Sequence, residues 1–263
     1  MRCRYFLPFL GLALFSIPFV ALRAQDGVHA PSGGTRMSII SIDVPPLPNA
    51  PFTATVSTSW IRTLDDGTTV TVQNRRTIAR DNNGRIYQER RYLYPAGNPR
   101  ENELRQIELS DPSTRIIYFC HPYDRTCEEH DYYWSNSPAP LIPAGPIRIN
   151  GVAGAGFLTR IALGNDLVSG VETVGTRETT AINPGAIGND RGIMIVKEFW
   201  YSAQLGINVI EKRDDPRVGQ QDFVVNEISL GEPDARLFDM PAGYRVFDMR
   251  KGAPPAAQGV GSN

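Results

Sequence analysis

The amino-acid sequence predicts a mainly β protein, built as a single curved antiparallel sheet or half-barrel with few or no long helices. Three observations predict this class. Apolar and polar residues alternate along many segments, Gly, Asn, Asp or Pro bounds these segments, and no convincing long amphipathic helix occurs in the 263 residues. The pattern favours one all-β domain, expected over residues 37–249, rather than two smaller ones.

The first predicted strand shows the alternation most clearly. Over residues 52–64 the even positions are mostly apolar, and the odd positions are Ser or Thr except for Ile61. The apolar set is Phe52, Ala54, Val56, Trp60 and Leu64. Because successive side chains point to opposite faces of a strand, this strand is expected to bury one face. Asp65 to Gly67 then supply the backbone conformation that a tight reversal needs.

Two more strands are predicted to continue an antiparallel meander. The second is marked by Val70, Val72 and Ile78, and the third by Ile86, Tyr92 and Tyr94. An Asp-Asn-Asn-Gly turn at residues 81–84 separates them. The other face of the meander is rich in Thr and Arg, so it is expected to contact water.

A hairpin is predicted around residues 116–120 and 127–130, and it carries Cys120 and Cys127. The third cysteine, Cys3, would be removed with the N-terminal leader described below. In an oxidising compartment, two cysteines that face each other across a short hairpin most simply form a disulfide. The chain-entropy model assigns so small a loop about 2.5 kcal/mol.

A rival interpretation of the same hairpin is a zinc site. Two thiolates and two imidazoles satisfy tetrahedral zinc, and Cys120, His121, Cys127 and His130 would supply them. This interpretation is the less favoured one, because export favours oxidation and adjacent strand residues point to opposite faces. No metal ion and no cofactor is therefore predicted.

The second half of the chain predicts a second run of strands. A Pro- and Gly-rich stretch over residues 135–156 is expected to be a long crossing loop that holds no ladder, and Val152 to Leu163 is a candidate for a short helix. Four strands are then predicted, at residues 171–182, 193–201, 207–212 and 223–230. The segment 193–201 has large apolar groups at both parities, so it is expected to be central and covered on both sides.

The N-terminus predicts export. A basic start, Met1 to Arg4, precedes an apolar run over residues 5–22 and the small residue Ala24, which indicates a signal peptide at residues 1–24. A lipoprotein would need a cysteine just after this run, and Cys3 lies before it, so the exported chain is expected not to be lipid-anchored. It is also expected not to span the membrane once the signal peptide is removed. Residues 25–36 are expected to form a disordered leader and residues 250–263 a disordered tail. The expected location is periplasmic or secreted.

The charge balance argues against one class of partner. The chain carries 27 Lys and Arg against 28 Asp and Glu, whereas a nucleic-acid binder needs a strongly basic face.

A local strip of arginines is a separate candidate binding site. If residue 80 pairs with residue 85, Arg75 lies opposite Arg90, and two facing arginines repel unless an anion joins them. An acidic partner or lipid headgroup is one interpretation, and a solvated strand face is the more ordinary one.

Two aromatic clusters are further candidates for binding. Phe199, Trp200 and Tyr201 would line a lipid-holding groove, although aromatic residues on a central strand more often belong to the core. The run from Tyr132 to Trp134, beside Asn136, suits a sugar-binding platform or equally a lid over a sheet edge.

The sequence carries no signature of catalysis. It has no Gly-x-Ser-x-Gly elbow and no metal-binding helix pair, and its imidazoles are His29, His121 and His130. Its adjacent carboxylates, such as Glu128 and Glu129, suit turns and edge strands better than an acid and a base across a cleft. An enzyme is therefore not predicted.

Several motifs carry a resemblance that covers most of the exported chain. They are Leu163-Gly164 to Gly170-Val171, Gly175-Thr-Arg177, Glu198-Phe-Trp-Tyr201, Leu205-Gly206, Glu232-Pro-Asp, Leu237-Phe238 and Pro241-Ala-Gly-Tyr244. With these motifs the chain resembles a family of uncharacterised exported bacterial proteins. The tryptophan hairpin and the Phe-x-x-Pro-x-Gly-Tyr segment are more distantly similar to the half-barrel superfamily of periplasmic lipoprotein carriers and sigma-factor regulators.

The superfamily resemblance implies an open curved sheet that cups an apolar cavity for acyl chains. No carrier site residue has a matching position in this chain. The expected function is a cell-envelope binding protein without chemistry of its own, with a lipid or lipoprotein as ligand. The alternative is a non-catalytic interaction or structural module that docks another envelope protein. A carrier would leave an apolar cavity of a few hundred Å³ unfilled by its own side chains.

Overall fold

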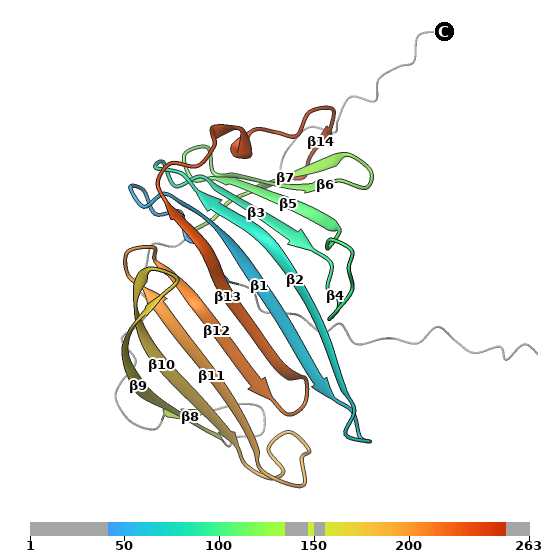
Figure 1. The fold of residues 1–263 in the computed structure, drawn as a ribbon, viewed down its shortest axis with the longest axis vertical. Helices are drawn as coiled ribbons and strands as arrows, with labels where there is room; N and C mark the ends of the chain where they lie inside the picture. The colour runs from blue at the N-terminus through green and yellow to red at the C-terminus, as the bar shows by residue number, and fades with distance from the viewer. Residues whose placement is uncertain (1–41, 135–146, 150–155, 251–263) are drawn as a thin grey trace, which may run out of the picture. The chain divides into compact units, whose positions relative to one another are not determined.

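The computed structural model describes residues 42–134, 147–149 and 156–250 (Figure 1). The predicted signal peptide and leader, and the tail from residue 251 onward, lie outside the described residues. Within the described ranges, no helix has the length and apolar character that crossing a membrane requires.

The described residues form one fourteen-stranded sheet and one short 3-10 helix, η1 (Ala235–Phe238). The strands are β1 (Phe52–Thr63), β2 (Thr69–Arg80), β3 (Ile86–Arg91), β4 (Tyr94–Pro95), β5 (Leu104–Asp111), β6 (Ile116–His121), β7 (Thr126–Asp131), β8 (Ile147–Ile149), β9 (Gly156–Val168), β10 (Val171–Ile182), β11 (Ile193–Ser202), β12 (Ile207–Asp215), β13 (Gly219–Leu230) and β14 (Arg245–Asp248). Their order is β14-β7-β6-β5-β3-β2-β1-β13-β12-β11-β10-β9-β8, and β4 pairs with β2 beside this path. The predicted mainly β class is confirmed.

The sheet is mixed rather than wholly antiparallel. Every neighbouring pair is antiparallel except β14 and β7, which run parallel from Arg245 beside Thr126 to Asp248 beside Glu129. Two antiparallel strands can follow each other through a tight turn, whereas parallel ones need a longer crossing. Here residues 132–244 separate the two strands, because β14 follows β13 and returns to the far edge of the sheet (Figure 1).

Strand β1 shows the predicted alternation. Phe52, Ala54 and Val56 are buried, and the odd positions between them are half-buried. Strand β1 pairs with β2 on one side and with β13 on the other, so it lies inside the sheet. We name the two faces after adjacent β1 residues, the Val56 face and the Ser57 face.

The main core lies on the Val56 face at the Phe52 end of β1. Its buried members are Ile42, Val44, Phe52, Ala54, Val56, Ile78, Ile86, Val171, Leu205, Ile207, Val209, Phe223 and Val225. Ile42 and Val44 precede the first strand, so the N-terminal described segment packs onto strands that follow it by more than a hundred residues. The hairpin between β9 and β10 also contributes, since the Ser169 hydroxyl donates to the Val225 carbonyl over 2.9 Å.

The meander is less regular in its polarity than the sequence predicts. Arg75 is exposed as expected, but Arg76 and Arg80 lie at even positions, on the Val56 face, and both are buried. Arg80 donates to the carbonyls of Ala50, Pro45 and Leu205, so it ties two loops to the sheet. The expectation that the arginines of the meander contact water is therefore wrong for these two residues.

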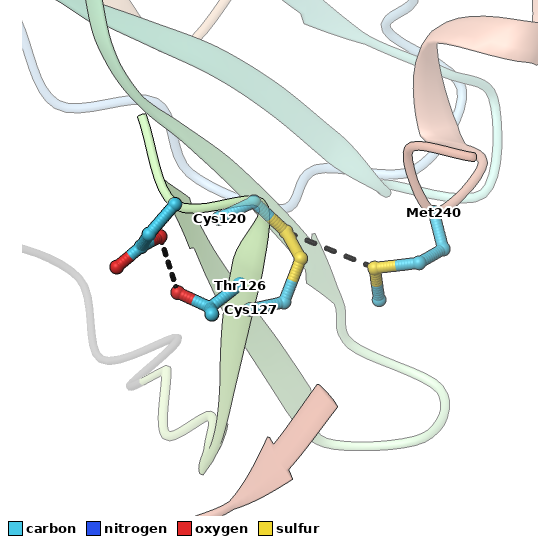
Figure 2. The surroundings of a disulfide bond; sticks show 5 residues. Cys120, Thr126, Cys127 and Met240 are labelled. Atoms are coloured by element: carbon cyan, nitrogen blue, oxygen red, sulfur yellow. Dashed lines mark hydrogen bonds between the residues drawn. A yellow bond between two sulfur atoms is a disulfide. The ribbon is translucent and has the colours of Figure 1, made fainter. Parts of the chain in front are cut away.

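A smaller core lies on the opposite face of the sheet, the Ser57 face. Ala79, Tyr87 and Leu109 form it, and Leu237 and Phe238 of η1 pack against it. Beside it, Cys120 and Cys127 are directly paired residues of β6 and β7 and form the predicted disulfide, with Cα atoms 4.0 Å apart. Figure 2 shows Met240 of the C-terminal segment beside this bond, with its sulfur 3.7 Å from Cys120 Sγ.

Two predictions for the second half need correction. The candidate helix over residues 152–163 is wrong where the chain is described, because β9 begins at Gly156 and pairs with β10 along its length. The expected loop over residues 135–156 contains a three-residue strand, β8, which pairs with β9; the rest of that stretch lies outside the described residues. Tertiary pairing decides both cases, because a short apolar segment fits either a helix or a strand.

Strand β11 is an interior strand, as predicted, but it is not covered on both sides. Met194 and Tyr201 are exposed by 55% and 44%, respectively. Met194 is directly opposite Ala181, which is itself opposite Phe157, and the Phe157 side chain is also exposed. This part of the sheet therefore presents an open face that carries apolar side chains.

Candidate functional site

An open groove of about 470 Å³ crosses the β10 to β13 strands. It is lined by Arg177, Thr179, Met194, Val196, Glu198, Lys212, Arg213, Asp214, Gln220 and Asp222. The groove opens on the Ser57 face, because Asp222 is directly opposite Ser59 of β1. Six of its ten lining residues are charged, and two, Met194 and Val196, are purely apolar.

One row of the groove alternates in charge from strand to strand. Arg177 is opposite Glu198, Glu198 is opposite Lys212, and Lys212 is opposite Asp222. Directly paired residues of neighbouring strands share a face and follow each other at about 4.8 Å. We call these four residues, Arg177, Glu198, Lys212 and Asp222, the charge ladder.

The next row is less charged and includes part of the apolar lining. Thr179 is opposite Val196, Val196 is opposite Asp214, and Asp214 is opposite Gln220. The groove therefore presents one ionic row beside a row of mixed polarity. Such a surface suits a partner with charges and hydrogen-bonding groups better than it suits an alkyl chain.

Glu198 is the best-anchored carboxylate of the charge ladder. It accepts hydrogen bonds from Trp200 Nε1 at 3.0 Å and from Arg177 Nη2 at 2.9 Å. The hydrogen bond from Trp200, the one from Arg177 and the nearby charge of Lys212 lower the pKa of Glu198 below its usual range. Glu198 is therefore ionised at neutral pH, which does not suit a general acid or base working near pH 7.

Trp200 is held by a glycine of the neighbouring strand. Gly175 lies opposite Trp200, and a Cβ at position 175 would lie 2.8 Å from Cζ3 of the indole ring. Because the glycine leaves that space to the ring, the indole packs against β10 and its Nε1 reaches Glu198. The charge ladder is thus supported from within the sheet.

The turn beside the groove is fixed by Asp215, the last residue of β12. Its carboxylate is buried and accepts hydrogen bonds from Arg217 Nη2 at 2.7 Å and from Arg213 Nη2 at 2.9 Å. These bonds, that from Arg217 foremost, hold the pKa of Asp215 well below its usual range. The turn between β12 and β13 is consequently anchored by a buried carboxylate with two arginine partners.

The structure does not bring the three predicted aromatic residues onto one surface. Phe199 is opposite Glu211, in a row that continues through Phe223 to Thr58 on the Val56 face. Trp200 lies on the Ser57 face, over Gly175. Neighbouring strand residues point to opposite faces, which is why this run of aromatics cannot line a single groove.

The predicted Arg strip does not form either. Residue 80 pairs with Ile86 rather than with Arg85, because the backbone N–H of Asp81 donates to the Arg85 carbonyl and closes the turn there. Arg75 instead binds Glu227 at 2.7 Å, and Arg90 binds Glu108 at 2.7 Å. The register predicted from the turn residues is wrong by one position, and a one-residue slip changes every facing pair.

The structure also shows where the remaining candidate residues of the hairpin region lie. The zinc interpretation is wrong, because the disulfide consumes both thiolates that it needs. His130 lies against the Phe119 ring, with centroids 5.3 Å apart, and its Nε2 is 3.1 Å from Glu128 Oε2.

Of the sugar-platform candidates, Tyr133 and Trp134 are exposed, while Asn136 lies outside the described residues. In the described ranges, no group of three or more His, Cys, Asp or Glu side chains is arranged to hold a metal ion.

Sequence reasoning missed the charge ladder altogether. Its members lie on four strands, and their alignment depends on the ten residues between β10 and β11 and on the extra residue at the irregularity beside Trp200. A charge count gives no signal, since each strand supplies a single charge to the row. The sequence predicts the strands of the two glycine-bounded hairpins from β11 to β13, but it does not predict how the residues of these strands pair.

No protein-family model matches this chain, and no curated protein matches it. Among solved structures, the chain is similar to MucB in the complex of Pseudomonas aeruginosa MucA and MucB, with 11% identity, a TM-score of 0.38, and coverage of 75% of this chain and 58% of that one. The chain thus spans less than two thirds of MucB.

Two other solved structures are similar over most of their own length. Lipoprotein LppX of Mycobacterium tuberculosis has 12% identity and a TM-score of 0.22, with coverage of 70% of this chain and 87% of that one. An outer membrane lipoprotein-sorting protein domain of Vibrio parahaemolyticus has 7% identity and a TM-score of 0.17, with coverage of 72% and 89%.

Proposed function

We propose that this chain is a non-catalytic binding protein of the cell envelope that docks a protein partner in the groove between β10 and β13. The observation that carries this proposal is the charge ladder. A row of four alternating charges beside exposed apolar side chains offers a partner both ionic specificity and some apolar contact.

Lipid binding is the second candidate, and the groove supports it less well. An acyl-chain site is expected to be lined by apolar side chains, whereas this groove has six charged residues and two purely apolar ones. The main core on the Val56 face is filled by its own side chains, from Ile42 to Val225. A lipid ligand is favoured by the exposed apolar side chains of Met194 in the groove and of Phe157 and Ile161 on the neighbouring strand β9.

Photo-crosslinking in the native host tests the proposal and does not require that the partner be identified first. Benzoylphenylalanine replaces Met194, which lines the groove and is 55% exposed. The matched control places the same probe at Tyr123, an aromatic residue of the β6–β7 turn that is 98% exposed and lies outside the groove. We expect a discrete protein adduct from position 194 and none from position 123.

A second measurement separates the two ligand classes. The chain is purified from the envelope without detergent, and its native mass spectrum is recorded under non-reducing conditions. A protein adduct at position 194 with no lipid-sized extra mass supports protein docking. A lipid-sized mass that is lost on activation, with no protein adduct at position 194, overturns the proposal in favour of lipid binding.

A further inference from the structure

The charge ladder is complementary to itself. Read from β10 to β13, its charges are positive at Arg177, negative at Glu198, positive at Lys212 and negative at Asp222. Reversing this order turns every positive position into a negative one. A surface with this property can pair with a second copy of itself, provided that the copy is turned in the right direction.

Symmetry defines that direction. In a two-fold dimer the same patch serves both subunits, so if one residue contacts another, the reverse contact also forms. A two-fold axis that runs along the strands, between β11 and β12, places Arg177 opposite Asp222 of the partner subunit and Glu198 opposite Lys212 of the partner subunit. The same axis keeps the strand directions of the two sheets aligned, as in most packed sheets.

The other in-plane orientation is excluded by charge. An axis along the charge ladder would place each residue opposite its own copy, so that Glu198 meets Glu198 and Lys212 meets Lys212. Like charges across an interface are strongly unfavourable and serve to reject wrong arrangements. The ladder therefore selects one arrangement of two copies.

Part of the charge of the ladder is not paired within one chain and is available for such a contact. Arg177 and Glu198 form an ion pair at 2.9 Å within one chain. Lys212 is exposed and makes no ion pair among the described residues, although its charge lies close enough to lower the pKa of Glu198. Asp222 accepts only from the amide of Gln220 in the described part of the chain, at 3.1 Å and 3.3 Å.

Two exposed apolar side chains, Ile161 and Met194, lie near the charge ladder. Ile161 is opposite Arg177 at one end and is 53% exposed, and Met194 lines the groove one row beyond Val196. Exposed ion pairs alone contribute little to association, so these apolar groups matter to its strength. The groove volume of about 470 Å³ leaves room for bridging water, which polar interfaces commonly hold.

We infer that the occupant of the groove is a second copy of this chain, joined in a two-fold dimer through the charge ladder. This inference rests on the proposed function, since it names the partner that the groove docks. A different protein would match all four charges only if it presented a complementary row at the spacing of a β-sheet. A second copy carries that row already.

Charge reversal in separate chains tests the inference. Glu198→Lys leaves Lys at both central positions of the ladder, and Lys212→Glu leaves Glu at both. Either variant alone would face like charges in its own homodimer, so its dimer dissociation constant is expected to rise ~100-fold or more. Mixed together, the two variants face opposite charges at both central positions and are expected to form a heterodimer.

The measurement is sedimentation velocity on the exported chain, with a mass tag on one variant so that native mass spectrometry identifies the heterodimer. Glu103→Lys, an exposed charge reversal between β4 and β5, is the matched control and is expected to dimerise like the parent. Circular dichroism and thermal unfolding establish that each variant is folded. Raising the salt concentration is expected to weaken the parent dimer, because exposed charge pairs are screened.

The outcomes separate this inference from the proposed function. A parent chain that stays monomeric up to about 0.5 mM overturns the second-copy inference. Single variants that dimerise as well as the parent, or folded single variants that fail to combine, overturn it as well. In each of these cases a protein adduct of another mass at position 194 would still support groove docking, whereas no adduct there would count against both.

Discussion

The guanidinium of Arg80 lies over the Phe52 ring, with its Cζ 5.0 Å from the ring centroid. Both side chains are completely buried, and they belong to directly paired positions of β1 and β2. The cation has its hydrogen-bond partners in backbone carbonyls, and burial lowers its pKa to about 10. An arginine thus occupies a place where the sequence pattern predicts a solvated residue.

Arg80→Met should destabilise the protein severely. It leaves the carbonyls of Ala50, Pro45 and Leu205 without their donor, and each lost partner of a buried polar group costs ~1–3 kcal/mol, so we expect a total of about 3–5 kcal/mol. Urea unfolding measures the loss. Arg75→Met, on the exposed face of the same strand, is the control and should change little; equal effects of the two variants would refute the assigned role of Arg80.

Removing the disulfide should have a smaller effect. Cys120 and Cys127 are seven positions apart, and the chain-entropy model gives about 2.5 kcal/mol for a loop of that size. The double variant Cys120→Ser/Cys127→Ser should therefore stay folded and unfold at lower urea concentration. A reducing agent should lower the midpoint of the parent chain and leave that of the double variant unchanged, and a parent midpoint insensitive to reduction would contradict the bond.

Gly175→Ala should disturb Trp200. The new Cβ would lie 2.8 Å from Cζ3 of the indole and 2.9 Å from Cβ of Leu163, so something must shift, and overpacking of this kind costs about 1–3 kcal/mol. Gly192→Ala is the matched control, since its Cβ would meet nothing closer than the Ile182 carbonyl at 3.5 Å.

A double variant decides whether the indole ring is the cause. Trp200→Phe removes the ring atoms that the new Cβ would meet, so the cost of Gly175→Ala should fall in that background. Unfolding free energies of the four chains of this cycle provide the measurement. Strict additivity would show that Gly175 and Trp200 do not interact as the structure places them.

Asp215 should make the unfolding free energy of the protein decrease at low pH. Its folded-state pKa is held below the ordinary value of about 4, so its contribution is complete above that pH and is lost as the pH falls through the folded-state pKa. We expect Asp215→Asn to cost about 3 kcal/mol at pH 7, because Arg213 and Arg217 lose a buried partner.

The shape of the pH curve is the sharper observable. Below about pH 4 the unfolding free energy of Asp215→Asn should fall less steeply than that of the parent chain, so the two curves converge. Urea unfolding at a series of pH values records both. Asp190→Asn, at an exposed carboxylate, should follow the parent curve, and parallel curves for parent and Asp215→Asn would contradict the pKa shift.

Much of the strand content could be predicted from sequence, because alternation and turn residues are local signals. Strands β1, β6, β7 and β10 lie within one or two residues of their predicted bounds, and the disulfide follows from two cysteines in one short hairpin. Strand β9 was not predictable in this way, since its apolar residues suit a short helix equally well until β10 pairs with it.

What the sequence by itself determined is therefore the class of the protein, most but not all of its strand-forming segments, and its covalent link. The tertiary structure decided which residues face each other. It placed Ile86 opposite Arg80, buried Arg80 beneath two loops, and aligned Arg177, Glu198, Lys212 and Asp222 across four strands. The physical reason is the two-residue period of a strand. Register depends on hydrogen bonds between distant segments, and a slip of one residue moves every side chain to the opposite face.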